Sequence, residues 1–376
     1  VSSHSLELDD VVNEASLNPA VSVISAALAY GSVKASTGQD MIAAIVAGYE
    51  TMVRLGIALD PAEHYRRGFH PTATCGVFGA AAAVSKLARL DAHQTAYALG
   101  IAGSQAAGSM EFLTDGAYTK RFHGGWSAHS GVVAASLAKE GFTGPQTIIE
   151  GKFGFLHSYS LSASSEKVLK EWGAPYSVMQ TSIKPHACCR YNQGSIDCII
   201  SIMNDNELKA DDIESIQVSI LKAGFALVAE PEELKKNPSS IVDAQFSMPF
   251  GAAVAVVHRN AFLDQYSHEN IASGAVKDLM TKVSCIQDSE IEKDFPKKWS
   301  ARVELKTNDK RSFRVELDYP KGDPENPLSW EEIIVKFRNL VAPIMNTSEQ
   351  DTIIDTVRNL EHVSDIGELM NLMAKR

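Results

Sequence analysis

The stretch "TATCGVFGAAAAVSKLARL", Thr72 to Leu90, decides the fold of the first half of this chain. It combines four consecutive alanines with apolar residues at helical spacing, and two glycines lie inside the pattern. Glycines also occur in loops, but the alanine run favours a helix. Glycine in an exposed helix is about 1 kcal/mol less favourable than alanine. Its repeated use therefore predicts helices whose backbones approach closely in a crowded core.

Helical patterns also occupy the sequence on both sides of this stretch. Asp91 is a candidate N-cap for the pattern that follows it. Two uncharged runs, residues 15–33 and 92–110, are long enough to cross a membrane. Their Ser, Gly, Asn and Gln content favours buried helices over membrane spans. The further helical patterns are "AVSVISAALAYGSVKAS" (20–36), "QDMIAAIVAGYETMVRLGIAL" (39–59) and "DAHQTAYALGIAGSQAAGS" (91–109).

The sequence pattern changes after Gly144-Pro145. "IESIQVSIL" alternates like a half-buried strand, and "ARVELK" and "SFRVELDY", joined by "TNDK", are typical of a hairpin. Helices return where "SWEE" (329–332) and "TSEQ" (347–350) resemble capping boxes. This order predicts a large all-helical domain with an inserted smaller α+β domain. The predicted boundaries are 1–179 plus 326–376 for the helical domain and 180–325 for the inserted domain.

Composition limits the function. The formal net charge of -11 argues against nucleic-acid binding, so an anion site must be a local pocket of positive charge. Five cysteines without a CxxC pair predict neither a disulfide framework nor a zinc site, and they fit a reducing cytosol. We see no signal peptide and expect a cytoplasmic protein.

Four polar clusters could carry chemistry, and three of them combine Lys or Arg with His beside Gly, Pro or aromatic residues. We interpret these segments as loops between buried helices, where sites usually lie. Fixed cations hold carboxylates or phosphates, and no nucleotide-binding glycine loop occurs, so a small polycarboxylate is the expected ligand. Histidine, or lysine with a depressed pKa, could move a proton near neutral pH. The clusters are "ELDD" (7–10), "RRGFHP" (66–71), "DGAYTKRFHGGWSAHSG" (115–131) and "KPHACCRY" (184–191).

Each cluster also has a structural interpretation. The acids at 9 and 10 could favour a helix N-terminus, and His70 before Pro71 could begin a helix. Lys120 and Arg121 could be a solvated surface pair, and Lys184 before a proline could be loop charge. Four further side chains are most simply packed in the interior, namely the thiols of Cys188 and Cys189 and the apolar Phe246 and Met248.

Taken together, three stretches resemble the MmgE/PrpD family, which includes 2-methylcitrate dehydratase, cis-aconitate decarboxylase and iminodisuccinate epimerase. The resemblance runs over essentially the whole chain. It implies a large helical domain and a smaller α+β lid in a homodimer, an active site between the domains, and no metal or other cofactor. The stretches are "YRRGFHPTATCGVFGAAAAVSKLARLD", "FLTDGAYTKRFHGGWSAHSGVVAASLAKEGFTGP" and "IKPHACCRY".

The resemblance also implies site residues. Lysines and arginines would bind substrate carboxylates, the two histidines would donate or accept protons, and one of the paired acids would orient a histidine. The expected catalytic residues are His70, Lys120, His123, Lys184 and Asp9, and the expected substrate-binding residues are Asp10, Arg121, His186, Arg190 and Tyr191.

Three positions depart from the family pattern. Val11 replaces a threonine after the paired acids, Asn18 replaces a histidine before proline, and Phe225 replaces the decarboxylase's tyrosine. Asparagine cannot shuttle a proton, which disfavours cis-aconitate decarboxylation and weakens 2-methylcitrate dehydration. We predict a cofactor-independent lyase, a dehydratase acting on a small di- or tricarboxylate such as 2-methylcitrate. An epimerase of an iminodisuccinate-like dicarboxylate and a catalytically impaired carboxylate-binding relative are the alternatives.

Overall fold

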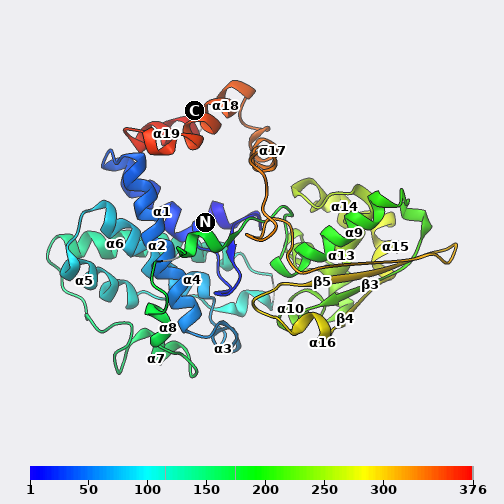
Figure 1. Cartoon of the computed structure of the whole chain (residues 1–376), viewed down its shortest axis with the longest axis horizontal. Coiled ribbons are helices and arrows are strands. Elements are labelled where there is room, and N and C mark those ends of the chain that lie inside the picture. Colours follow the sequence, from blue (N-terminus) through cyan, green and yellow to red (C-terminus); the bar gives the residue numbers. More distant parts are fainter. Residues whose placement is uncertain (115, 174, 375–376) are drawn as a thin grey trace. The chain divides into compact units, whose positions relative to one another are not determined.

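The computed structural model describes residues 1–114, 116–173 and 175–374 (Figure 1). Asp115, which begins the cationic stretch, lies outside these residues. The mostly helical fold with a small mixed sheet confirms the coarse fold class, whereas the domain boundaries at 180 and 325 stay predictions. The chain divides into a helical unit, Val1–Ser5, Asp9–Thr181 and Leu328–Arg376, and an α/β unit, Leu6–Leu8 and Ser182–Pro327.

The helical unit is built around α4 (Pro71–Leu87), which contains most of the stretch that decides the fold. Every residue from Pro71 to Ser85 is buried. The small side chains of this helix let four other helices pack against it. These are α1 (Ala20–Val33), α2 (Gly38–Ala58), α5 (Ala92–Gly103) and α6 (Thr119–Lys139).

The helical glycines mark close backbone contacts, as predicted. A Cβ atom placed on Gly79 of α4 would lie 2.7 Å from the Met52 Cβ and 2.9 Å from the Gly48 carbonyl oxygen of α2. Real Cβ atoms essentially never approach other atoms so closely. Glycine at this position therefore allows α2 and α4 to pack at a distance that no larger residue permits.

The cationic stretch differs from its prediction. We expected a loop, but Lys120, Arg121 and His123 lie in the first two turns of α6. The prediction was wrong because its glycines were interpreted as turn signals. A Cβ atom on Gly131 would lie 2.4 Å from the Ala80 Cβ of α4, so this glycine serves close helix packing instead.

One helix in the described part of the chain, α2, is long and apolar enough to cross a membrane, which is weak evidence on its own. α2 packs against α4 and carries a buried ion pair, Glu50–Arg54, as expected of a core helix. The two uncharged runs of the sequence contain α1 and α5, which are shorter.

Capping explains several helix boundaries. Asp91 forms the predicted N-cap of α5, in a capping box with Gln94. Ser329 and Glu332 form the predicted box before α17, but the box before α18 uses Asn346 rather than Thr347.

The other elements from residue 1 to 182 and at the C-terminal end are mostly short. The C-terminal ones are α17 (Trp330–Val341), α18 (Thr347–Arg358), η7 (Leu360–His362) and α19 (Ile366–Met373). The earlier ones are η1 (Ser2–His4), β1 (Val11–Val12), α3 (Pro61–Arg66), η2 (Met110–Leu113), α7 (Phe155–Tyr159), α8 (Glu166–Leu169), η3 (Ser177–Gln180) and β2 (Thr181–Ser182).

The α/β unit contains a four-stranded sheet of order β4-β3-β5-β6. β3 (Ile213–Ile220) runs parallel to β4 (Val283–Gln287) and antiparallel to β5 (Ala301–Thr307). β5 forms the predicted hairpin with β6 (Ser312–Leu317). Ile216, Val218 and Ile220 are all buried, which confirms the predicted half-buried strand.

Helix α9 (Gln193–Asp205) packs against β5 and β6, and α13 (Met248–His258) packs against α9 and α15 (Gly274–Thr281). The remaining elements of this unit are short. They are η4 (Arg190–Asn192), η5 (Ala210–Asp212), α10 (Lys222–Val228), α11 (Glu232–Lys235), α12 (Ile241–Gln245), η6 (Leu263–Gln265), α14 (His268–Ala272) and α16 (Ser289–Glu292).

Candidate functional site

Two predicted histidines meet inside the helical unit. His70 occupies the N-cap position of α4, before Pro71, and its backbone N–H donates to the Gly108 carbonyl at 3.0 Å. His123 lies in α6, which packs against α4. The two Nδ1 atoms are 3.0 Å apart, and the Phe112 ring makes a T-shaped contact with each imidazole. Helix packing thus joins residues that are 53 positions apart in the sequence.

Both histidines are held in the neutral form. Burial, followed by the charges of His4, His123 and Lys120, lowers the pKa of His70 well below its usual value. Burial, His4 and Lys120 lower the pKa of His123 to about 4. Because a neutral imidazole carries one N–H, one Nδ1 donates and the other accepts. The two Nε2 atoms therefore differ, since one bears a lone pair and the other a proton.

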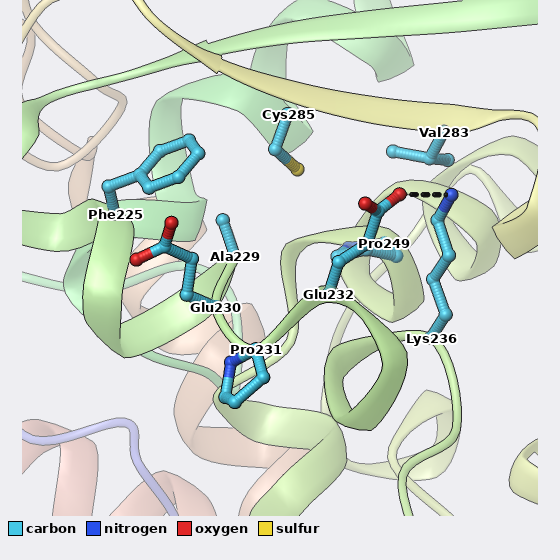
Figure 2. Close-up of a pocket in the computed structure, with 9 residues that line it drawn as sticks. All are labelled: Phe225, Ala229, Glu230, Pro231, Glu232, Lys236, Pro249, Val283 and Cys285. Atoms are coloured by element: carbon cyan, nitrogen blue, oxygen red, sulfur yellow. Dashed lines mark ion pairs between the residues drawn. The ribbon is translucent and has the colours of Figure 1, made fainter.

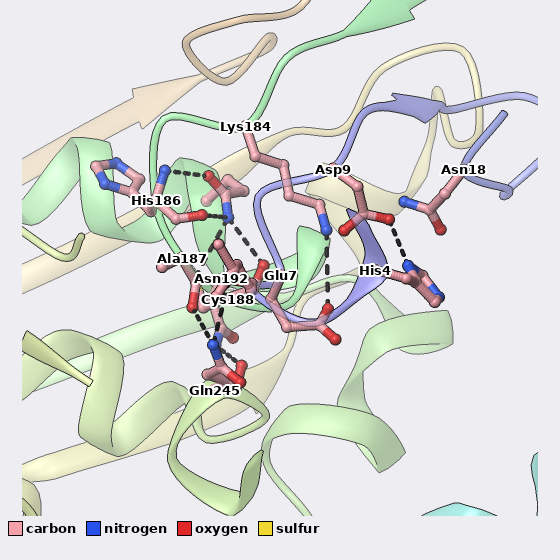
Figure 3. Close-up of polar contacts among 12 residues, drawn as sticks. His4, Glu7, Asp9, Asn18, Lys184, His186, Ala187, Cys188, Asn192 and Gln245 are labelled. Carbon is pink, nitrogen blue, oxygen red and sulfur yellow. Dashed lines mark hydrogen bonds and ion pairs between the residues drawn. The ribbon is translucent and has the colours of Figure 1, made fainter. Parts of the chain in front are cut away.

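A third histidine, His4, was not predicted. This residue is 0% exposed, and its ring stacks on that of His70 with centroids 5.8 Å apart. Its Nδ1 lies 2.6 Å from the Asp9 carboxylate, a contact drawn in Figure 3. Its Nε2 is buried and makes no hydrogen bond within the described part of the chain. The signal was present in "HSLELDD", where the histidine stands five residues before Asp9.

The cations of α6 have different surroundings. Lys120 is partly buried, and its charge lowers the pKa values of both His70 and His123, so it belongs to the same cluster. Arg121 is partly buried as well, and its guanidinium lies over the Tyr118 ring, 4.6 Å from the ring centroid. Lys120 thus adjoins the histidines, whereas the described contact of Arg121 is with an exposed aromatic ring.

Asp10 and Asn18 hold the start of α1. The Asp10 carboxylate accepts hydrogen bonds from the Ala20 N–H at 3.0 Å and from the Tyr49 hydroxyl at 2.7 Å. The Asn18 amide donates to the Asp10 carbonyl, and its oxygen accepts from the Thr72 hydroxyl at 3.2 Å. The helix-start interpretation thus describes Asp10, while Asp9 contacts a histidine. Substrate binding by Asp10 stays a prediction.

In the α/β unit, three predicted cationic residues lie beside carboxylates. Lys184 Nζ lies 3.9 Å from Glu7, and both side chains are buried (Figure 3). His186 Nε2 lies 2.9 Å from Asp197, a residue of α9. The Arg190 guanidinium lies 2.5 Å from the Asp323 carboxylate, and its central carbon lies 5.1 Å from the centroid of the Trp299 ring. Tyr191 stacks on the same ring, with the two ring centroids 4.7 Å apart.

The Lys184 cluster therefore contains buried charge, not the loop charge of the structural interpretation. The roles predicted for its cations and for Tyr191 stay predictions. Cys188 is fully buried, and burial raises the pKa of its thiol to about 12. Since a thiolate is the reactive form, this residue is a packed thiol, as its structural interpretation holds.

A separate cavity of about 410 Å³ lies within the α/β unit (Figure 2). Phe225, which the family resemblance places where the decarboxylase has a tyrosine, lines it together with Glu230, Glu232 and Lys236. Lys236 pairs with Glu232 at 2.8 Å. These charged groups carry an excess of negative charge, which opposes the binding of a polycarboxylate. Among the described residues, no group of three or more His, Cys, Asp or Glu side chains has the arrangement to hold a metal ion.

Comparison with known proteins covers almost the whole chain. Residues 1–167 match the MmgE/PrpD N-terminal domain, and residues 186–362 match the MmgE/PrpD C-terminal domain. A cis-aconitate decarboxylase-like protein of Aspergillus oryzae is 29% identical over 390 residues, covering 98% of this chain and 80% of the relative. The cis-aconitate decarboxylase of Aspergillus terreus is 29% identical over 387 residues, with 98% and 78% covered. The human cis-aconitate decarboxylase is 26% identical over 385 residues, with 99% and 77% covered.

Proposed function

Because this chain belongs to the MmgE/PrpD family, we propose that it is a cofactor-independent lyase acting on a small di- or tricarboxylate. The similar proteins named as cis-aconitate decarboxylases support a lyase of this kind. They make cis-aconitate the first substrate to test, and 2-methylcitrate, the dehydratase substrate expected from the sequence, the second.

One observation carries the proposal, namely a pair of buried neutral histidines beside a lysine. His70 and His123 share a 3.0 Å contact, and the charge of Lys120 acts on both. One imidazole can accept a proton while the other donates one, so the pair supplies both an acid and a base at neutral pH. The Lys120 ammonium would hold a substrate carboxylate and stabilise the negative charge that develops on it.

The shared chemical step is the formation of a carbanion next to a carboxylate. In dehydration, a histidine removes a proton from that carbon, the C–O bond breaks, and hydroxide leaves with a proton from an acid. In decarboxylation, the C–C bond breaks, carbon dioxide leaves, and the acid delivers a proton to the carbon. Both routes place negative charge where a neighbouring ammonium stabilises it.

Proton NMR of reactions in heavy water tests the proposal. The purified chain is incubated separately with cis-aconitate, 2-methylcitrate, malate and aspartate analogues. A decarboxylated product with deuterium at the newly protonated carbon, or a dehydrated product with a new olefin signal, is expected from at least one tricarboxylate. If every substrate is unchanged and none exchanges deuterium, the proposal fails.

Two matched variants localise the activity. We expect Lys120→Ala and His123→Asn to lower turnover by at least about 100-fold with little change in melting temperature. His129→Asn is the control, because His129 is an exposed residue of the same helix that stacks on Trp126. Equal activity in all three variants would contradict the site.

Epimerisation is the second candidate, and Asn18 is the observation that favours it. Asn18 stands where the family carries a histidine, and its amide is engaged with Asp10 and Thr72. The loss of that proton-transfer group suits a reaction that only exchanges a proton at one carbon. Deuterium incorporation into a chiral dicarboxylate, without a new olefin or loss of carbon dioxide, would identify it.

A further inference from the structure

His4 lies beside the pair formed by His70 and His123 but has no role in the proposed function. It is fully buried in η1, which packs against α6, and it lies against His70 with an angle of 18° between the ring planes. Its Nε2 is buried and makes no hydrogen bond to the described residues. Buried polar atoms are normally paired, so this nitrogen is suited to a ligand or a reacting group.

The Asp9 contact determines which nitrogen of His4 reacts. The carboxylate lies 2.6 Å from Nδ1, so it accepts the Nδ1–H and holds the ring in one orientation. The lone pair of the neutral ring is then on Nε2, the atom that makes no hydrogen bond to the described residues. A carboxylate that fixes the tautomer of a histidine in this way also stabilises the imidazolium that forms when the ring takes up a proton.

We propose that His4 is a third proton-transfer residue of the site, and that Asp9 is its positioning residue. This inference rests on the proposed function and deepens it. In the dehydration direction, the substrate C–H bond breaks, the Nε2–H bond forms, and the electron pair passes into the adjacent carboxylate. In decarboxylation, Nε2 first takes up a proton from solvent to give the imidazolium. Carbon dioxide then leaves, the electron pair of the broken C–C bond stays on carbon, and the Nε2 proton moves to that carbon.

The alternative is that His4 only anchors the segment 1–5. That segment does contact α6, since a Cβ atom on Gly125 would lie 2.9 Å from the Val1 nitrogen. An anchoring histidine would stabilise the fold without acting on the reacting carbon. The two roles therefore differ in the turnover number and in the response of Nε2 to a bound carboxylate, and not only in stability.

The first measurement uses the wild-type chain labelled with [15N]histidine. Long-range proton–nitrogen NMR spectra, recorded with and without citrate as the probe, should show His4 with its proton on Nδ1. The Nε2 resonance should shift on adding citrate, whereas the nitrogens of the exposed His129 should not. A proton on Nε2, or an Nε2 resonance that does not respond to saturating citrate, would overturn the inference.

The second measurement compares His4→Gln and Asp9→Asn with the His129→Gln control. For a substrate that the wild type consumes, we expect kcat to fall by about 100-fold or more in both variants, with KM within about threefold. Asp9→Asn should also move the His4 proton to Nε2. Wild-type kcat in His4→Gln would overturn the assignment. If the wild type consumes no substrate, the proposed function fails by itself, while the NMR spectra still decide the role of His4.

Discussion

Acid should destabilise the fold through its buried histidines, well above the pH at which carboxylates are protonated. Burial lowers the pKa of His64 to about 4, and that of His123 is also about 4, against an ordinary value of 6.5. His70 is shifted in the same direction. All three side chains are buried in the helical unit, and His64 Nε2 contacts the Thr74 hydroxyl at 2.9 Å.

The sign follows from which state binds protons first. As the pH falls below 6.5, the unfolded chain protonates these histidines while the folded chain does not, so the free energy of unfolding decreases. The loss continues down to a pH of about 4 and then levels off. A shift from 6.5 to 4 corresponds to about 3 kcal/mol for each of His64 and His123. Carboxylates with lowered pKa values, such as Asp288, have an ordinary value of 3.8 and act at more acid pH.

Proton uptake on unfolding measures this effect directly. At pH 5.3 a histidine with a pKa of 6.5 is about 94% protonated, whereas one with a pKa of 4 is about 5% protonated. Unfolding in urea at this pH, followed in a pH-stat, should therefore take up about 0.9 proton at His64. His64→Gln should reduce the total uptake by that amount, and the difference should vanish at pH 8. A reduction below about 0.3 proton at pH 5.3 would refute the reasoning.

The remaining predictions concern packing and caps, and urea unfolding measures each. Gly79→Ala should lower the free energy of unfolding by about 1–3 kcal/mol, because the added Cβ would overlap α2. Gly274→Ala should leave it nearly unchanged, because a Cβ there has no other atom within 4 Å. Arg54→Ala removes the cation of a buried pair and its bonds to the carbonyls of residues 168 and 170, and should destabilise by about 3–5 kcal/mol. Asn346→Ala should destabilise α18 by about 1 kcal/mol and Thr347→Ala by less, and the reverse order would contradict the observed cap.

Sequence periodicity was sufficient for the elements whose own residues specify them. The alanine run of α4, the alternation of β3 and the caps at Asp91 and Ser329 are local patterns, and the structure confirms them. The prediction of a loop at the start of α6 was wrong, because the sequence alone does not show whether a glycine forms a turn or a close contact between helices. Only its neighbour, here Ala80 against Gly131, distinguishes the two.

In the candidate site, too, the sequence predicted some residues and only the tertiary contacts distinguished others. His70, His123 and Asp9 were selected from motifs and from the family resemblance, and the structure brings all three into one cluster. Asp10 was indistinguishable from Asp9 in the sequence, yet its carboxylate accepts from the N–H of Ala20 at the start of α1. His4 was missed because a single histidine in a short polar segment has no periodic pattern.

The amino-acid sequence by itself determined where helices and strands form and which residue types were available for acid–base chemistry. These properties depend on neighbours within a few positions along the chain. The tertiary structure alone decided that His4, His70 and His123 share one buried place and that the neutral forms of His70 and His123 prevail. A pKa depends on burial and on charges within a few ångströms, and residues 53 to 119 positions apart become neighbours only when η1, α4 and α6 pack together.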